Sequence, residues 1–179
     1  MGTFSHQWMG IAPDGGERSM IDDLTGLVNL RRFLEQLEAE FNRFQRYGDK
    51  FVVMLGDLDH FKAINDRFGQ AAGDEVLIQF STIAGSQIRK VDTLGRLGGE
   101  EFGVLLPHTT LEAGLVPAER IRQSCRAISI QTQDPLGLSI SLGITEVRAE
   151  DRSIEDILRR ADEALYLAKD KGRNRCEIA

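Results

Sequence analysis

The sequence predicts a single α/β domain in which helices flank a mixed or antiparallel sheet. Helical and strand-like patterns alternate along the chain, but without the strict repeat of a doubly wound parallel fold. A glycine-rich hairpin near residue 98 joins two apolar segments, and such a short connection requires antiparallel pairing. With 179 residues, of which 41% are hydrophobic, the chain is long enough for one domain with a substantial core.

The first half of the chain predicts three helices around one buried strand. Apolar residues recur at helical spacing from Leu30, and Gly48 supplies a stop signal. The nearly continuous apolar run that follows is typical of a strand buried on both faces. The expected ranges are a helix from Leu30 to Gly48, a strand over Phe51–Leu58, a short helix over 61–67 and, after a break at Gly69, a helix over 72–89.

The second half predicts a hairpin, a helix, a strand and a last helix. Thr110 is a suitable cap for a helix over 111–130, in which Pro117 predicts a kink or a delayed start. Apolar and small residues alternate over 138–144, as in a strand with one face on the core. Ser153 and Asp156 resemble a capping box, which places the start of a last amphipathic helix that ends at Gly172.

Composition excludes several classes of protein. The net charge of -6 argues against a general nucleic-acid binder and against an anionic-membrane binder. Cys125 and Cys176 form neither a disulfide framework nor a zinc pattern, so a reducing cytoplasm is the expected setting. No apolar run reaches the ~20 residues of a membrane span. Residues 1–20 lack periodicity and are expected to be a linker, a leader or a truncated N-terminal extension.

Two carboxylates follow two glycines in the hairpin. Gly98 and Gly99 are expected to form a two-residue turn, because glycine readily takes a positive φ. Glu100 and Glu101 would then lie at the lip of a strand. Adjacent anions are unfavourable unless a cation or a basic group satisfies them, so the pair indicates a metal or proton-transfer site. The alternative is a solvated hairpin tip.

Asp57 ends the buried strand just before a predicted helix. A helix N-terminus attracts phosphate, and a neighbouring carboxylate suits the Mg²⁺ that accompanies phosphate. If the hairpin pairs beside this strand, Asp57, Glu100 and Glu101 share one edge, as two-metal phosphoryl chemistry requires. Asp57 could also be only a helix cap. Lys169 and Arg173, four residues apart, could reach one anion together or be ordinary cations of a helix end.

Four segments together resemble one known family. They are Asp22–Asn29 (DDLTGLVN), Asp57–Asp74 (DLDHFKAINDRFGQAAGD), Arg96–Phe102 (RLGGEEF) and Ala161–Asn174 (ADEALYLAKDKGRN). In this order they resemble the GGDEF domain of diguanylate cyclases, and the resemblance assigns residues 21–179 to that domain. The third signature position is Glu100, an acidic variant that active members also use.

The resemblance implies a fold, an activity and partners. The fold would be the palm-like sheet of nucleotidyl cyclases, central, mixed and largely antiparallel. The activity would be the condensation of two GTP into cyclic di-GMP with loss of two pyrophosphates, carried out by a homodimer with two Mg²⁺ or Mn²⁺ ions per site. A sensory or receiver domain upstream would also be typical. The alternative is a non-catalytic receptor for GTP or cyclic di-GMP that uses the same pocket.

The resemblance also implies residue roles. Asp57, Glu100 and Glu101 match the metal-binding carboxylates and the carbonyl of Leu58 matches a backbone ligand, with Glu100 the candidate to assist deprotonation. Phosphate binding is implied for His60, Phe61, Lys62, Lys169 and Arg173. Guanine recognition is implied for Asn65 and Asp74, which from the residues alone could be cap or turn residues. An inhibitory product site is implied for Arg89 and Asp92, which could also be a simple charge pair.

Overall fold

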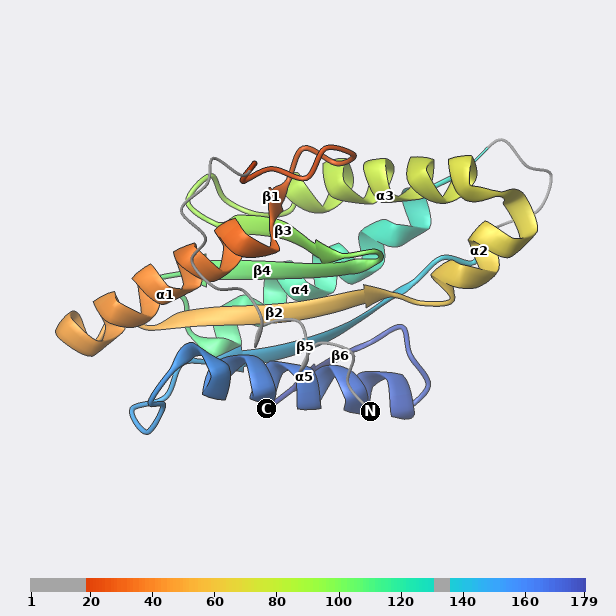
Figure 1. Ribbon diagram of the computed structural model, residues 1–179. Helices are drawn as coiled ribbons and strands as arrows, with labels where there is room; N and C mark the ends of the chain where they lie inside the picture. Colours follow the sequence, from red (N-terminus) through yellow and green to blue (C-terminus); the bar gives the residue numbers. More distant parts are fainter. Residues whose placement is uncertain (1–18, 131–135) are drawn as a thin grey trace.

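The computed structural model describes residues 19–130 and 136–179, and the expected leader over 1–20 falls almost wholly outside this part of the chain. One mixed sheet organises the fold, with strand order β1-β3-β4-β2-β5-β6 (Figure 1). The strands are β1 (Val28–Asn29), β2 (Phe51–Leu58), β3 (Thr93–Gly98), β4 (Glu101–Pro107), β5 (Ile140–Glu146) and β6 (Cys176–Ile178). The helices are α1 (Leu30–Tyr47), α2 (Phe61–Phe68), α3 (Gln70–Gly85), α4 (Leu111–Ser124) and α5 (Ile154–Asp170), with a short 3₁₀ turn at Cys125–Ala127.

The sheet is antiparallel at its centre and parallel at both edges. Strand β2 pairs antiparallel with β4 and with β5, and β3 pairs antiparallel with β4. The edge strands β1 and β6 pair parallel with β3 and β5. The predicted mixed, largely antiparallel sheet is therefore confirmed.

Helices cover both faces of the sheet, because β2 is apolar on both. Val52 and Met54 point to the face covered by α2, α3 and α4, where they join a core that includes Phe80. Val53 and the residues two positions on either side of it point to the opposite face, where α1 and α5 supply a second core that includes Phe33 (Figure 1). This alternation follows from the two-residue period of a strand.

Several predicted element boundaries are confirmed, and others differ from the observed boundaries by a few residues. Helix α1 begins after Asn29, whose side chain accepts from the amide of Arg32 at 3.1 Å, and ends at Gly48 with φ 74°. Helix α3 spans 70–85 instead of 72–89, so residues 86–92 form a turn. The last predicted strand lies two residues further along, at 140–146.

Two details differ from the prediction, one in helix α4 and one at the start of α5. Helix α4 begins directly after its Thr110 cap despite Pro117, and it ends at Ser124, six residues early. Only half of the capping box is formed: the Asp156 carboxylate accepts from the backbone amide of Ser153 and from that of Arg152, the latter at 2.9 Å, but the Ser153 side chain makes no cap bond.

The hairpin turn differs from the prediction by one residue. Strand β3 continues to Gly98, which pairs with Glu101, so the two turn residues are Gly99 and Glu100. Neither Gly98 nor Gly99 has a positive φ. The cause is an extra residue in β3, Leu97, where the register shifts between Arg96 and Gly98. Glu100 therefore lies in the turn itself, while Glu101 is the first residue of β4.

Replacing Gly143 with Ala is expected to lower the free energy of unfolding by about 2 kcal/mol or more, because overpacking cannot relax against backbone. The added Cβ would lie 2.1 Å from the carbonyl oxygen of Ala161 and 2.3 Å from the amide nitrogen of Leu165, so α5 would have to move away from β5. Urea unfolding measures the effect. Gly85→Ala is the control, since nothing lies within 4 Å of its added Cβ. Equal stability of the two variants would contradict the packing argument.

Candidate functional site

Two carboxylates lie side by side where β2 and β4 meet. Asp57 and Glu101 are directly opposite each other in the antiparallel register, and each is only 8% exposed. Directly opposed residues place their side chains on the same face of a sheet. Glu100 lies beside them in the turn, and its carbonyl accepts from the amide of Leu58 at 3.2 Å. The three predicted carboxylates therefore share one end of the sheet.

Lys169 on α5 forms an ion pair with Asp57 across this edge. Burial nevertheless raises the pKa of Asp57 above its usual value, because desolvation outweighs the hydrogen bond and the charge of Lys169. The negative charges of Glu100 and Asp59 raise the pKa of Asp57 further. The edge thus carries more negative charge than its own lysine offsets, which favours a bound cation.

The start of α2 contributes backbone donors to the same place. His60 takes a left-handed φ of 55°, and its carbonyl accepts from the amides of Ala63 and Ile64 at 3.0 and 3.4 Å. The amides of Phe61 and Lys62 precede these first helical bonds, as at any helix N-terminus. Such an end attracts anions.

A cavity of about 220 Å³ lies among these groups, with Glu101 outside its lining. Its lining residues are Asp57, Leu58, Asp59, His60, Phe61, Lys62, Glu100, Lys169 and Arg173. All of them except Asp59 are predicted site residues. Acidic groups and cationic or backbone donors therefore surround one cavity, as binding a metal-bound triphosphate requires.

Asp59 is a site residue that the sequence reasoning missed. Its carboxylate accepts from the hydroxyls of Ser139 and Ser141 at 2.6 and 2.7 Å and from the amide of Asn174 at 3.0 Å. That last bond holds the turn in which Arg173 has a left-handed φ of 64°. The sequence does contain one indication of this role: Asp59 is the second acid of the Asp-Leu-Asp run and comes directly after a buried strand.

Asn65 and Asp74 lie near each other at the α2–α3 junction and are not part of the cavity lining. A Cβ added at Gly73 would lie 1.8 Å from Asn65 Oδ1, so the glycine allows α3 to approach this side chain closely. Asn65 Oδ1 is buried with no hydrogen-bond partner among the described residues. Unpaired buried acceptors are uncommon in proteins, so this oxygen marks Asn65 as a candidate site residue.

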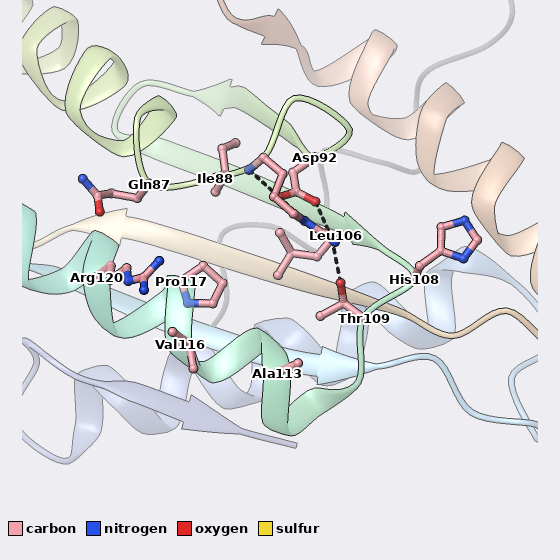
Figure 2. A pocket seen from close by; sticks show the side chains of 11 residues that line it. Gln87, Ile88, Asp92, Leu106, His108, Thr109, Ala113, Val116, Pro117 and Arg120 are labelled. Carbon is pink, nitrogen blue, oxygen red and sulfur yellow. Dashed lines mark hydrogen bonds and ion pairs between the residues drawn. The ribbon is translucent and has the colours of Figure 1, made fainter.

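Arg89 and Asp92 lie in a second cavity, of about 280 Å³, between the 86–92 turn and α4 (Figure 2). The Arg89 guanidinium donates to the Asp92 carboxylate, to the carbonyl of Pro107 and to the hydroxyl of Thr109, each at 2.9 Å. The bond to Asp92 raises the pKa of Arg89 above its already high usual value. The Arg89 side chain is 55% exposed and that of Asp92 2%, so a ligand could reach the guanidinium.

The metal prediction fits the donors present, although no complete cage is preformed. The described residues include no group of three or more His, Cys, Asp or Glu side chains placed to hold a metal ion. The donors are instead carboxylate and carbonyl oxygens beside a phosphate-binding helix start. Mg²⁺ is usually bound this way, by one or two carboxylates with water and substrate phosphates. Lys169 shows that the Asp57 carboxylate already attracts a cation.

Comparison with known proteins identifies the family of the chain. The chain matches the family described as "Diguanylate cyclase, GGDEF domain" over residues 19–175. It is 42% identical over 167 residues to the diguanylate cyclase DgcP of Pseudomonas aeruginosa, a match that covers 93% of this chain and 25% of DgcP. The chain thus spans a quarter of the length of this relative. No helix in the described ranges is long and apolar enough to cross a membrane.

Solved structures are similar as well. The diguanylate cyclase SiaD of P. aeruginosa, solved with its activator SiaC, is 40% identical with a TM-score of 0.85, covering 90% of this chain and 62% of that one. The active GGEEF domain of a diguanylate cyclase from Vibrio cholerae is 38% identical with a TM-score of 0.79, covering 85% and 97%. The chain belongs to the diguanylate cyclase GGDEF-domain family.

Proposed function

We propose that this domain is a diguanylate cyclase that condenses two GTP into cyclic di-GMP and two pyrophosphates. The observation that carries the proposal is the opposition of Asp57 and Glu101, with Glu100, the start of α2 and Lys169 around one edge. The similar V. cholerae domain shares the Gly-Gly-Glu-Glu-Phe signature and is described as active. On this proposal, residues 21–179 form the catalytic domain, which acts in the cytoplasm and is preceded by a sensory or receiver domain.

Acidic residues at the sheet edge would hold the metal ions and assist deprotonation of the attacking 3′-hydroxyl of GTP. Two Mg²⁺ or Mn²⁺ ions held by Asp57, Glu100, Glu101 and the carbonyl of Leu58 would polarise the α-phosphate and lower the pKa of the attacking 3′-hydroxyl. Glu100, in the turn, is the residue we assign to assist loss of that proton. Each domain binds one GTP, so two domains must face each other as a homodimer for both hydroxyls to attack.

Cationic and backbone groups would bind the phosphates. The amides of Phe61 and Lys62 lie at the start of α2, next to His60, and would donate to the β- and γ-phosphates. Lys169 and Arg173 would supply positive charge. A divalent ion at Asp57 would replace the ammonium of Lys169 as the partner of that carboxylate, which frees Lys169 to bind phosphate. Positioning and charge neutralisation are the chief requirements of phosphoryl transfer.

Incubation with GTP and Mg²⁺, followed by chromatography for cyclic di-GMP, tests the proposal. In the Glu100→Gln variant product formation is expected to fall at least about 100-fold, because the variant loses the charge at the reacting centre. Fold and stability should not change, since Glu100 lies in a turn. Glu150→Gln, in an exposed turn, is the control. Parent protein that binds GTP without making product would favour the receptor alternative instead, and full turnover by Glu100→Gln would remove Glu100 from the mechanism.

Asp74→Ala is expected to reduce the preference for GTP over ATP at least about tenfold. A carboxylate accepts from the N1 and N2 donors of guanine, an edge that adenine lacks, and Asn65 lies against the neighbouring Gly73. The measurement is product formation with each nucleotide at limiting concentration. Asp66→Ala, an exposed change on α2, is the matched control. Unchanged selectivity in Asp74→Ala would refute guanine recognition by this residue.

We also propose product inhibition through the Arg89 and Asp92 cavity, since a guanidinium can donate to guanine O6 and N7. In Arg89→Ala the cyclic di-GMP concentration for half-inhibition is expected to rise at least about tenfold, because a charged hydrogen bond to the ligand is lost. The initial rate without added product should stay close to that of the parent. Lys90→Ala, the exposed neighbouring change, should leave inhibition intact. Equal inhibition of Arg89→Ala and the parent would contradict the assignment.

A further inference from the structure

Arg96 joins two parts of the chain that are far apart in sequence. Its Nη1 lies 3.2 Å from each carboxylate oxygen of Asp22, in the N-terminal hairpin, the turn that the antiparallel bridge between Ile21 and Val28 closes. Its Nε donates to the carbonyl of Gly99 at 2.9 Å. Gly99 is the residue directly before Glu100 in the turn. One guanidinium therefore connects the N-terminal hairpin to the turn that carries a predicted catalytic carboxylate.

Asp22 is held in place by its own hairpin. Its Oδ2 accepts from the amide of Thr25 at 2.9 Å and from the Thr25 hydroxyl at 2.6 Å. Its backbone amide donates to Leu27, and its carbonyl accepts from Gly26, both at 2.8 Å. Burial alone would raise the pKa of Asp22, but the hydrogen bonds from Thr25 and Arg96 and the charge of Arg96 lower it overall. Asp22 therefore stays ionised as a fixed anchor for Arg96.

The turn formed by Gly99 and Glu100 makes few contacts with the rest of the domain. Gly99 is exposed, and a Cβ placed on it would have no atom within 4 Å. Within the described ranges, the Gly99 carbonyl accepts a hydrogen bond from Arg96 Nε, and the Glu100 carbonyl accepts one from the amide of Leu58. The Leu58 bond holds one side of the turn against β2. The bond from Arg96 holds the other side, and the same guanidinium is paired with Asp22.

We infer that Arg96 and Asp22 are positioning residues that fix the Gly99–Glu100 turn, so that the N-terminal hairpin sets the place of the Glu100 carboxylate. This rests on the proposed function, in which Glu100 acts at the reacting centre. The two residues act through the turn and do not touch the nucleotide. Their loss should therefore reduce the rate of the bound complex more than the binding of GTP.

Arg96→Lys and Asp22→Asn test this in the full chain. A lysine ammonium cannot bond Asp22 and Gly99 in the fork geometry of a guanidinium, and Asn removes the charge of Asp22 while keeping its size. We expect kcat for cyclic di-GMP formation to fall about tenfold in each variant, the effect of one lost charged hydrogen bond, with KM for GTP changed less than about threefold. Because both act through one contact, the double variant should be no slower than the slower single variant.

Arg160→Lys is the matched control. Arg160 is 15% exposed against 17% for Arg96, and it too joins a carboxylate, Asp151, to a main-chain carbonyl, that of Glu146 at 2.9 Å. It lies away from the cavity. A general loss of stability should affect all three single variants alike, whereas loss of positioning should affect only Arg96→Lys and Asp22→Asn.

Amide hydrogen exchange of the nucleotide-free protein supplies a readout that does not need activity. We expect the peptide containing Gly99 to Phe102 to exchange about tenfold faster in Arg96→Lys and Asp22→Asn than in the parent, and unchanged in Arg160→Lys. If Arg96→Lys fails to fold, Asp22→Asn carries the test, with Thr25→Val, which removes the 2.6 Å bond to Asp22, as a milder variant.

Each outcome supports or overturns the inference. Unchanged exchange of the turn in Arg96→Lys and Asp22→Asn overturns it. A raised KM confined to Arg96→Lys also overturns it, because the guanidinium would then contact the nucleotide directly. If the parent makes no cyclic di-GMP, the proposed function fails, and the exchange comparison alone decides whether Arg96 and Asp22 fix the turn.

Discussion

The register between β2 and β4 is the constraint on which the site depends. The pairing of Leu55 with Gly103 and of Asp57 with Glu101 places both carboxylates on one face at one end of the sheet. A slip of one residue would send one of them to the opposite face, because side chains alternate along a strand. Two glycines oppose such a slip, because an added Cβ would lie 2.8 Å from Phe33 at Gly103 and 2.7 Å from Leu142 at Gly56, so a larger side chain does not fit at either position. Core packing and site geometry are therefore fixed by the same pairing.

The acidic side chains at this edge of the sheet lie in a partly buried place, where a charged group is unfavourable because it loses contact with water. The serines and the Asn174 amide satisfy Asp59, while Asp57 has Lys169 and still keeps a raised pKa. Asp57 and Asp59 thus each have a partner, yet with Glu100 and Glu101 the edge retains an excess of negative charge. An arrangement of this kind is unfavourable for stability alone and is typical of functional sites. Two roles are separated here: the Asp59 carboxylate is occupied by the neighbouring hydroxyls and amide, whereas Asp57 keeps a raised pKa beside the cavity.

Much of the fold could be predicted from the sequence, because helical periodicity marks α1 and α5, Gly48 ends α1, and a continuous apolar run marks β2. The shared edge of Asp57, Glu100 and Glu101 was also predicted, on the condition that the hairpin pairs beside β2, as it does. The position of the hairpin turn was not, because the bulge at Leu97 is set by pairing with β4 and leaves no local signal. The roles of Asp59 and Arg96 depend on partners about 80 and 74 residues away, contacts that local patterns do not reveal.

The most direct measurement is a crystal structure with a non-hydrolysable GTP analogue and Mg²⁺. The account predicts a metal ion between the Asp57 carboxylate and the triphosphate, phosphate oxygens at the amides of Phe61 and Lys62, and Lys169 moved from Asp57 to phosphate. A triphosphate bound elsewhere, with the Asp57–Lys169 pair intact and no ion beside it, would contradict the central claim.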